Sequence, residues 1–278
     1  MHEKWSHPET LTARWISRFG RDAAEKLLQW NNSVPDIGGC FSGKIDKSEE
    51  GLYLEDYRIL RRSGKNPLYS TGEKVYIQDE AAAVVARLAA GLGKGGSVLE
   101  IGAAPGGKTH HLQETADFVV SLDSSSSRLL RWLENRSRLK WQNCFPVIAS
   151  GQIPPFNERF DMVFIDAPCT NTGVYRRRGD ARWKWSEEYL ENSVALQREL
   201  LVSAGELVLP GGILIYSTCS LEEEENQKQV EWFEKRNDLF HRRNLSGPDE
   251  LVRDGMICIF PPDHKIDGLF AAAWRRDQ

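Results

Sequence analysis

The chain has 278 residues, of which 40% are hydrophobic and 27% charged, with a formal net charge of −4. This length and composition predict a globular protein of one large domain with an appendage, or of two modest domains. They exclude a membrane span, because every apolar run is shorter than the ~18 residues that a bilayer requires. The opening residues lack an export signal, so we expect no secretion.

The cysteine content indicates a reducing, cytoplasmic environment. There are five cysteines and no CxxC pair: Cys40, Cys144, Cys169, Cys219 and Cys258. This odd number argues against a disulfide framework and against a zinc site, so we expect free thiols and no metal. Basic residues are concentrated at 58–65 and 176–184 and acidic ones at 222–225. Such clusters are either solvated faces or binding surfaces.

The first third of the chain predicts helices followed by a turn-rich segment. Apolar residues recur every three or four positions over 9–30, which predicts one or two amphipathic helices that can bend at Gly20. Residues 31–75 are rich in turn formers, and we expect only short strands there. An alanine-rich helix is predicted over 78–96, ending at glycines.

From residue 97 onward, apolar strands alternate with helical patterns. The expected strands are 97–102, 118–123, 144–149, 161–166, 211–217, 256–261 and 268–274. The expected helices are 106–114, 126–139, 186–208 and 222–235. Repeated strand–helix units predict a parallel, doubly wound sheet with helices on both faces and ligands at the carboxyl ends of the strands.

The turn at 102–108 is a candidate ligand site. It runs from a strand into a helix, its small residues allow close approach of the backbone, and a helix N-terminus favours negative groups. It matches neither the GxGxxG nor the P-loop spacing. The next strand ends at Asp123, which can bind both hydroxyls of a ribose or cap the following helix. Together with the turn, Asp123 favours the ribose interpretation.

Two further strands end in cysteine-bearing turns, DAPCTNTG around Cys169 and STCSLEEEEN around Cys219. In a doubly wound sheet both turns open on the edge that carries Gly102 and Asp123. A free cysteine is usually a small buried hydrophobe, and we keep this interpretation for the other three. The polar, turn-forming neighbours make Cys169 and Cys219 candidate reactive thiols.

These motifs resemble those of the RNA 5-methylcytosine methyltransferases, the group of the bacterial small-subunit rRNA enzymes and the eukaryotic NOL/NOP/Sun proteins. The resemblance covers roughly residues 7–274 and includes YIQDEAA, AAPGGKT, DAPCTNTGVYRR, YSTCSLEEEEN and DGLFAAAW. It implies an α/β, class I methyltransferase Rossmann-like sheet with a small N-terminal helical or α+β subdomain. Residues 1–75 then form an RNA-binding-type subdomain, and 76–278 an S-adenosylmethionine-dependent methyltransferase domain.

The implied reaction is methyl transfer from S-adenosyl-L-methionine to C5 of a cytosine in RNA, with rRNA favoured over tRNA. C5 is a poor nucleophile until a thiolate adds to C6. By resemblance, Cys219 is this nucleophile, Cys169 assists product release, and Asp166 lies between cofactor and base. The matching cofactor-binding residues are Gly102, Ala103, Ala104, Pro105, Gly106, Gly107, Lys108, Asp123, Arg128 and Asp166. We expect a monomer with RNA as its partner and no membrane contact.

Two positions depart from the family pattern. Glu100-Ile101-Gly102 stands where the family commonly has Asp-x-Cys, and Ser150 stands where an aspartate usually meets the adenine amino group. A serine accepts a hydrogen bond more weakly than a carboxylate, so this change bears on cofactor affinity. The basic and indole side chains of 176–178 and 182–185 are candidates to grip RNA. The alternative is a surface loop whose tryptophans pack into the core.

Three other functions compete with this interpretation. An NAD-dependent oxidoreductase shares the sheet but needs another glycine spacing and gives no reason for two strand-end cysteines. A thiol hydrolase needs a histidine base, and none of the six histidines has an evident cysteine-protease context. A catalytically inactive RNA-binding scaffold of the same fold is the third. The presence of both cysteines favours an active enzyme.

Overall fold

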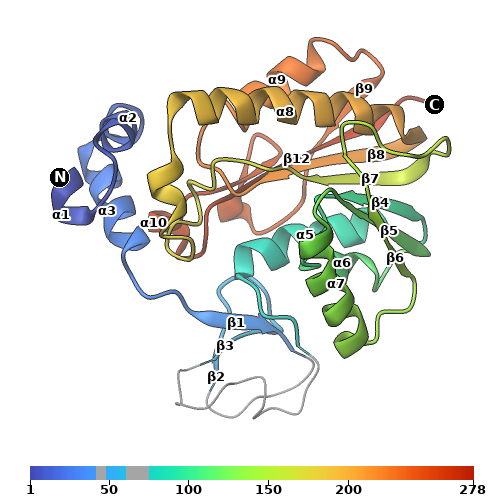
Figure 1. The fold of residues 1–278 in the computed structure, drawn as a ribbon, viewed down its shortest axis with the longest axis horizontal. Coiled ribbons are helices and arrows are strands. Elements are labelled where there is room, and N and C mark those ends of the chain that lie inside the picture. Colours follow the sequence, from blue (N-terminus) through green and yellow to red (C-terminus); the bar gives the residue numbers. More distant parts are fainter. Residues whose placement is uncertain (42–47, 61–74) are drawn as a thin grey trace.

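The computed structural model describes residues 1–41, 48–60 and 75–278 (Figure 1). Arg61, Arg62 and Lys65, part of the first basic cluster, lie outside the described residues. The chain begins with three helices: α1 (His2–Trp5), α2 (Glu9–Phe19) and α3 (Arg21–Asn31). The helices α2 and α3 are separated at Gly20, whose φ of 83° suits glycine, so the predicted pair with a break is confirmed.

A small antiparallel sheet follows the helices. Its strand order is β1 (Ile37–Cys40), β3 (Tyr57–Leu60) and β2 (Ser48–Glu50). The short strands expected in this segment are therefore present. Phe41, Leu60 and Val75 form a separate apolar cluster under this sheet.

The main sheet is doubly wound, with five parallel strands in the order β6 (Cys144–Ile148), β5 (Phe118–Asp123), β4 (Ser97–Ile101), β7 (Phe160–Asp166) and β8 (Val208–Thr218). Antiparallel strands extend it beyond β8 in the order β12 (Leu269–Arg276), β11 (Met256–Ile259) and β10 (Val252–Arg253), while β9 (Phe240–Arg243) pairs with β12. The strand–helix alternation predicted the parallel half, and the antiparallel pairing of the last strands was not predicted.

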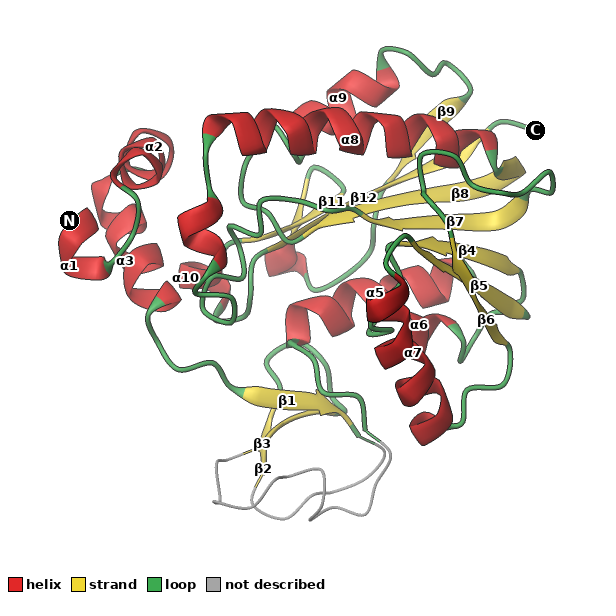
Figure 2. Ribbon diagram, viewed as in Figure 1, coloured by secondary structure: helices red, strands yellow, loops and turns green. Residues whose placement is uncertain are grey.

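Helices cover both faces of this sheet, as predicted (Figure 2). On one face lie α5 (Glu80–Leu92), α6 (Thr109–Leu112) and α7 (Ser126–Leu139). On the other lie α8 (Glu187–Glu206) and α9 (Gln227–Glu234). The described residues also form three short helices: η1 (Ala181–Lys184), η2 (Asp249–Leu251) and α10 (Pro261–His264). No described helix is long and apolar enough to cross a membrane.

Two predicted helices are shorter than expected. The helix after the glycine turn is a single turn, Thr109–Leu112, and α9 begins at Gln227 instead of Glu222. The second difference has a clear cause. Glu222 and Glu225 are fully buried and bind other segments, so their backbone forms a turn before the helix starts.

The N-terminal helices pack against the edge of the main sheet where the parallel strands end. Their apolar residues share one cluster with three residues of that edge: Tyr175, Trp185 and Leu221. Buried Glu222 ties the two parts together, since Arg14 pairs with its Oε2 at 2.6 Å and Trp15 Nε1 donates to its Oε1 at 3.0 Å. The N-terminal segment therefore forms one wall of any site at this edge.

Candidate active site

The two cysteine-bearing turns meet at the carboxyl edge of the sheet. Cys169 follows β7 and Cys219 follows β8, and these strands are parallel neighbours with Asp166 opposite Ser217. The Sγ atoms of the two cysteines lie 3.3 Å apart. Cys169 is buried, whereas Cys219 is partly exposed and its Sγ lies 3.4 Å from Asn171 Oδ1. The pair therefore consists of one accessible and one enclosed thiol.

The environment distinguishes the two thiols. The hydrogen bond to Cys219, followed by burial, raises the pKa of the Cys169 thiol well above its ordinary value. Cys169 is therefore protonated at neutral pH and enclosed, whereas Cys219 is partly exposed. Of the two sulfurs, Cys219 is the one that a substrate can reach, which favours it as the attacking sulfur.

A buried carboxylate holds the two turns together. Glu225 Oε1 accepts from Thr170 N and Gln197 Nε2, both at 2.9 Å, and its Oε2 accepts from the hydroxyls of Thr170 and Ser220. Thr170 follows Cys169 and Ser220 follows Cys219, so one side chain links the neighbours of both cysteines. Burial raises the pKa of Glu225.

Glu225 and Glu222 are the site residues that sequence reasoning missed. Both belong to the run Glu222–Glu225, for which a solvated face was the plain interpretation. That interpretation is wrong for these two, because their carboxylates are fully enclosed and hydrogen-bonded. The available signal was their position directly after the cysteine turn, where a carboxylate can fold back on the turn.

The glycine turn between β4 and α6 is shaped by contacts that only small residues permit. Gly102 has a φ of 82°, and a Cβ there would collide with the backbone oxygen of Asp166. Gly102 N donates to Leu122 O at 2.8 Å, and Ala104 N donates to Asp123 Oδ2 at 3.1 Å. The turn therefore lies directly beside the ends of β5 and β7.

Asp123 organises this turn as well as the start of α7. Its carboxylate is buried and also accepts from Ser125 N at 2.9 Å. Arg128 lies 3.6 Å from the same carboxylate and donates to the carbonyl oxygen of Ala104. The helix-cap interpretation of Asp123 is wrong, because the N-cap of α7 is Ser125, whose hydroxyl accepts from Arg128 N at 3.3 Å. Each Asp123 oxygen can accept a further hydrogen bond, and binding of a ribose stays a prediction.

An ion pair connects the glycine turn with the cysteine-bearing strand. Lys108 Nζ lies 2.6 Å from Asp166 Oδ2. The Asp166 side chain is 34% exposed, far more than Asp123, and Ser217 Oγ donates to its other oxygen at 3.4 Å. Asp166 therefore presents a carboxylate beside the glycine turn, on the strand that leads to Cys169.

The two departures from the family pattern lie in different surroundings. Glu100 is buried beneath the turn, where Thr109 and Ser121 donate to its Oε2, and burial raises its pKa to about 7. Its hydrogen bond with Thr109, the first residue of α6, links β4 to the end of the glycine turn. Ser150 lies in the loop after β6 and accepts a hydrogen bond from Gln152 N at 3.2 Å.

Most of the second basic cluster is committed to the fold. Arg176 is only 6% exposed and pairs with Asp36 at 2.8 Å, while Arg177 bridges Asp79 and Asp267 at 2.7 and 2.6 Å. Both guanidinium groups are thus held by carboxylates of the fold, and their contact with RNA stays a prediction. Two further residues of this segment, Arg182 and Trp185, are buried, so for them the alternative of packing into the fold is confirmed. Four members are exposed: Arg177, Arg178, Trp183 and Lys184.

Comparison with known proteins places the chain in a family. The model of the 16S rRNA methyltransferase RsmB/F family matches residues 91–275. The ribosomal RNA small subunit methyltransferase F of Klebsiella pneumoniae (strain 342) is 34% identical over 250 residues, which are 82% of this chain and 50% of that protein. The enzyme of the same name from Cronobacter sakazakii is also 34% identical, over 76% of this chain and 47% of that protein.

Solved structures agree on the fold. The crystal structure of PH0851 is 27% identical and superposes with a TM-score of 0.87 over 99% of this chain and 67% of that one. NSun6 from Pyrococcus horikoshii is 18% identical, with a TM-score of 0.82 over 98% of both chains. The fold is thus the class I methyltransferase Rossmann-like fold. The chain belongs to the 16S rRNA methyltransferase RsmB/F family, and it spans about half the length of the curated relatives it matches.

Proposed function

We propose that the protein transfers a methyl group from S-adenosyl-L-methionine to C5 of a cytosine in RNA, with rRNA the favoured substrate over tRNA. The observation that carries this proposal is the pair of thiols, 3.3 Å apart, at the carboxyl edge of the sheet. C5 methylation needs a sulfur nucleophile close to a cofactor site. Hydride transfer between a substrate and NAD does not require such a pair.

The residues of the glycine turn suit S-adenosylmethionine. From Gly102 to Gly107 the turn carries no side chain larger than the proline ring, so a ligand can approach its backbone closely. Lys108 is the last residue of the turn. Asp123 suits the ribose hydroxyls, and Arg128 lies 3.6 Å from its carboxylate. Asp166 is held beside the turn by its ion pair with Lys108. The cofactor, when bound, supplies an electrophilic methyl group.

Cys219 is the proposed nucleophile. Its thiolate forms the S–C6 bond, and the electrons of the C5=C6 double bond move toward C5 and N3, which makes C5 able to attack a methyl carbon. Asp166, held by Lys108, is placed to favour a protonated N3 and so to stabilise the charge that addition creates. Cys169 Sγ lies within hydrogen-bond distance of this sulfur, at 3.3 Å.

Cys169 is the proposed release residue. After methylation a water molecule takes the C5 proton, the electrons of the C5–H bond form the C5=C6 double bond again, and the S–C6 bond breaks with its electron pair leaving on the sulfur of Cys219. Cys169 Sγ lies 3.3 Å from the departing sulfur and can hydrogen-bond to it. Glu225 keeps this spacing by holding both turns.

Residues 1–75 are the proposed RNA-binding subdomain, and 76–278 the methyltransferase domain. The N-terminal helices pack against the carboxyl edge of the sheet, where Cys169 and Cys219 lie. This packing supports the division, because RNA bound at that edge contacts both parts. The five free cysteines suit a reducing cytoplasm.

The test is methylation of unmodified small-subunit rRNA, transcribed in vitro, with radiolabelled S-adenosylmethionine and bisulfite mapping. The expected result is one or a few 5-methylcytosines. Binding of RNA and cofactor without any methylation would support the inactive scaffold instead.

A further inference from the structure

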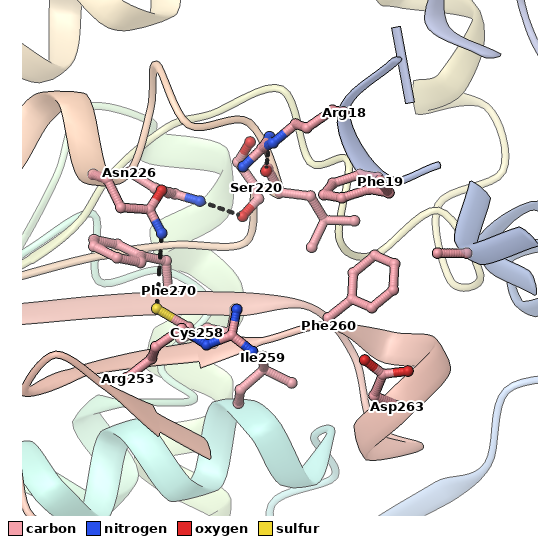
Figure 3. Close-up of a pocket in the computed structure, with 14 residues that line it drawn as sticks. Arg18, Phe19, Ser220, Asn226, Arg253, Cys258, Ile259, Phe260, Asp263 and Phe270 are labelled. Atoms are coloured by element: carbon pink, nitrogen blue, oxygen red, sulfur yellow. Dashed lines mark hydrogen bonds between the residues drawn. The ribbon is translucent and has the colours of Figure 1, made fainter. Parts of the chain in front are cut away.

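A cavity of about 290 Å³ lies beside Ser220, the residue that follows Cys219, and Figure 3 shows the side chains that line it. It is formed by the end of α2, the segment from Ser220 to Gln227, the end of β11 and the start of β12. None of the residues from Gly102 to Lys108 lines it. Its size is that of a small ligand site.

One wall of the cavity is aromatic. The rings of Phe19 and Phe260 lie 4.9 Å apart and are tilted by 44°, and both are only partly buried. Leu221, Leu269 and Phe270 add apolar surface. Because every nucleobase has a π-face, partly exposed rings of this kind are the usual platforms for unstacked bases.

The polar groups are mainly cationic or amide. The guanidinium of Arg18 stacks 4.8 Å from the Phe19 ring. Its Nη1 donates to Leu221 O and lies 3.8 Å from Glu222 Oε2, which leaves the N–H groups of its other two nitrogens for a ligand. Arg253 is exposed on the opposite side, and Asp263 is the one carboxylate among the lining residues.

An amide in the lining offers hydrogen bonds for a base edge. Gln227 Nε2 contacts Cys258 Sγ at 3.8 Å, and the buried Gln227 Oε1 has no hydrogen-bond partner among the described residues. An amide presents a donor and an acceptor together, as Watson–Crick edges do.

The cavity is adjacent to the proposed nucleophile. Ser220 and Leu221, which line it, directly follow Cys219, and successive Cα atoms are about 3.8 Å apart. We propose that this cavity binds one unstacked nucleotide of the RNA substrate, next to the cytosine that is methylated. The base stacks on Phe19 and Phe260, and the arginines bind the phosphates beside it. This inference rests on the proposed function.

The experiment uses an RNA oligonucleotide that spans the mapped cytosine, with a single abasic nucleotide placed at each flanking position in turn. For the wild-type protein, the abasic site at one position should raise the KM for RNA at least about five-fold, as expected for the loss of one stacked base. The variant Phe260→Ala with Arg253→Ala should raise the KM of the intact oligonucleotide similarly and be insensitive to the abasic nucleotide. Phe145→Ala, which removes an exposed ring on the distant edge strand β6, is the matched control and should behave as wild type.

Calorimetry with S-adenosylhomocysteine separates this effect from misfolding, because the cofactor affinity should be equal in all three proteins. If the double variant retains the wild-type KM, or responds to each abasic site as the wild type does, the cavity binds no nucleotide although the methyltransferase activity stands. If the wild type methylates no RNA, the proposed function itself fails.

Discussion

The Sγ atoms of Cys169 and Cys219 lie 3.3 Å apart although the residues are 50 positions apart in the chain. The spacing arises from two parallel neighbouring strands, β7 and β8, whose turns are joined by the carboxylate of Glu225. It brings two candidate reactive thiols within hydrogen-bond distance of each other.

The spacing predicts that mild oxidation joins the two sulfurs. Diamide removes one hydrogen from each thiol, so the wild-type protein should lose two hydrogens in mass and regain them with dithiothreitol. Peptide mapping should assign the bond to Cys169 and Cys219. Cys258→Ala should react in the same way, since Cys258 lies elsewhere. Mixed disulfides without this intramolecular bond would contradict the geometry.

Glu225→Gln should lower kcat and leave the affinity for S-adenosylhomocysteine unchanged. Four groups donate to the carboxylate, whereas a glutamine keeps one accepting oxygen and has a donor in place of the other. With its oxygen toward Thr170 N and Gln197 Nε2, its NH2 faces the hydroxyls of Thr170 and Ser220, which then have to rotate to accept and lose their own acceptor. The free energy of unfolding should fall by about 1–3 kcal/mol per group left unsatisfied, measured in urea. Glu223→Gln, at a partly exposed neighbouring position, is the control and should change neither quantity appreciably.

Arg14→Ala tests the junction between the N-terminal helices and the carboxyl edge of the main sheet. The substitution leaves the buried carboxylate of Glu222 without its closest cation, so the free energy of unfolding should fall by roughly 2 kcal/mol or more. Lys4→Ala breaks an exposed pair with Glu25 and should cost little. Equal, small effects of both substitutions would show that the junction does not depend on this pair.

Glu100 predicts a pH dependence of stability. Its pKa is raised from 4.5 to about 7, so between these values the folded protein retains a proton that the unfolded chain has lost. The free energy of unfolding should therefore decrease as pH rises from 4.5 to 7, by an amount on the order of 3 kcal/mol from this group. Glu100→Gln removes the dependence, and its amide oxygen can still accept from Thr109 and Ser121.

The measurement is the urea midpoint at several pH values, compared between the wild type and the variant. Asp267 titrates in the same range and is present in both, so the difference isolates Glu100. If the urea midpoints of the two proteins differ by the same amount at every pH from 4.5 to 7, Glu100 does not have a raised pKa.

The elements of the main sheet followed closely from the sequence, because strand–helix alternation depends on local apolar periodicity. The alternation also placed Gly102, Asp123, Cys169 and Cys219 at one edge, since parallel strands end together. The contacts of charged side chains were not predictable in this way. A run of glutamates has the same sequence whether it is solvated or, like Glu225, enclosed by donors from distant segments.

The arginines illustrate the same limit. Arg176 and Arg177 have the composition of a nucleic-acid patch, yet their partners Asp36, Asp79 and Asp267 come from segments that only the folded chain brings together. A short sequence window contains the charge but not its partner.

The unequal roles of the two cysteines are tested most directly by trapping the covalent intermediate. Each variant, Cys169→Ala and Cys219→Ala, is incubated with the substrate RNA, with or without S-adenosylmethionine, and analysed on a denaturing gel. Cys169→Ala should methylate once and stall as a protein–RNA adduct that requires S-adenosylmethionine, because the C5 proton can leave only after methylation. Cys219→Ala should show neither turnover nor adduct. An adduct in Cys219→Ala would reverse the roles, and activity of both variants without any adduct would contradict the covalent mechanism.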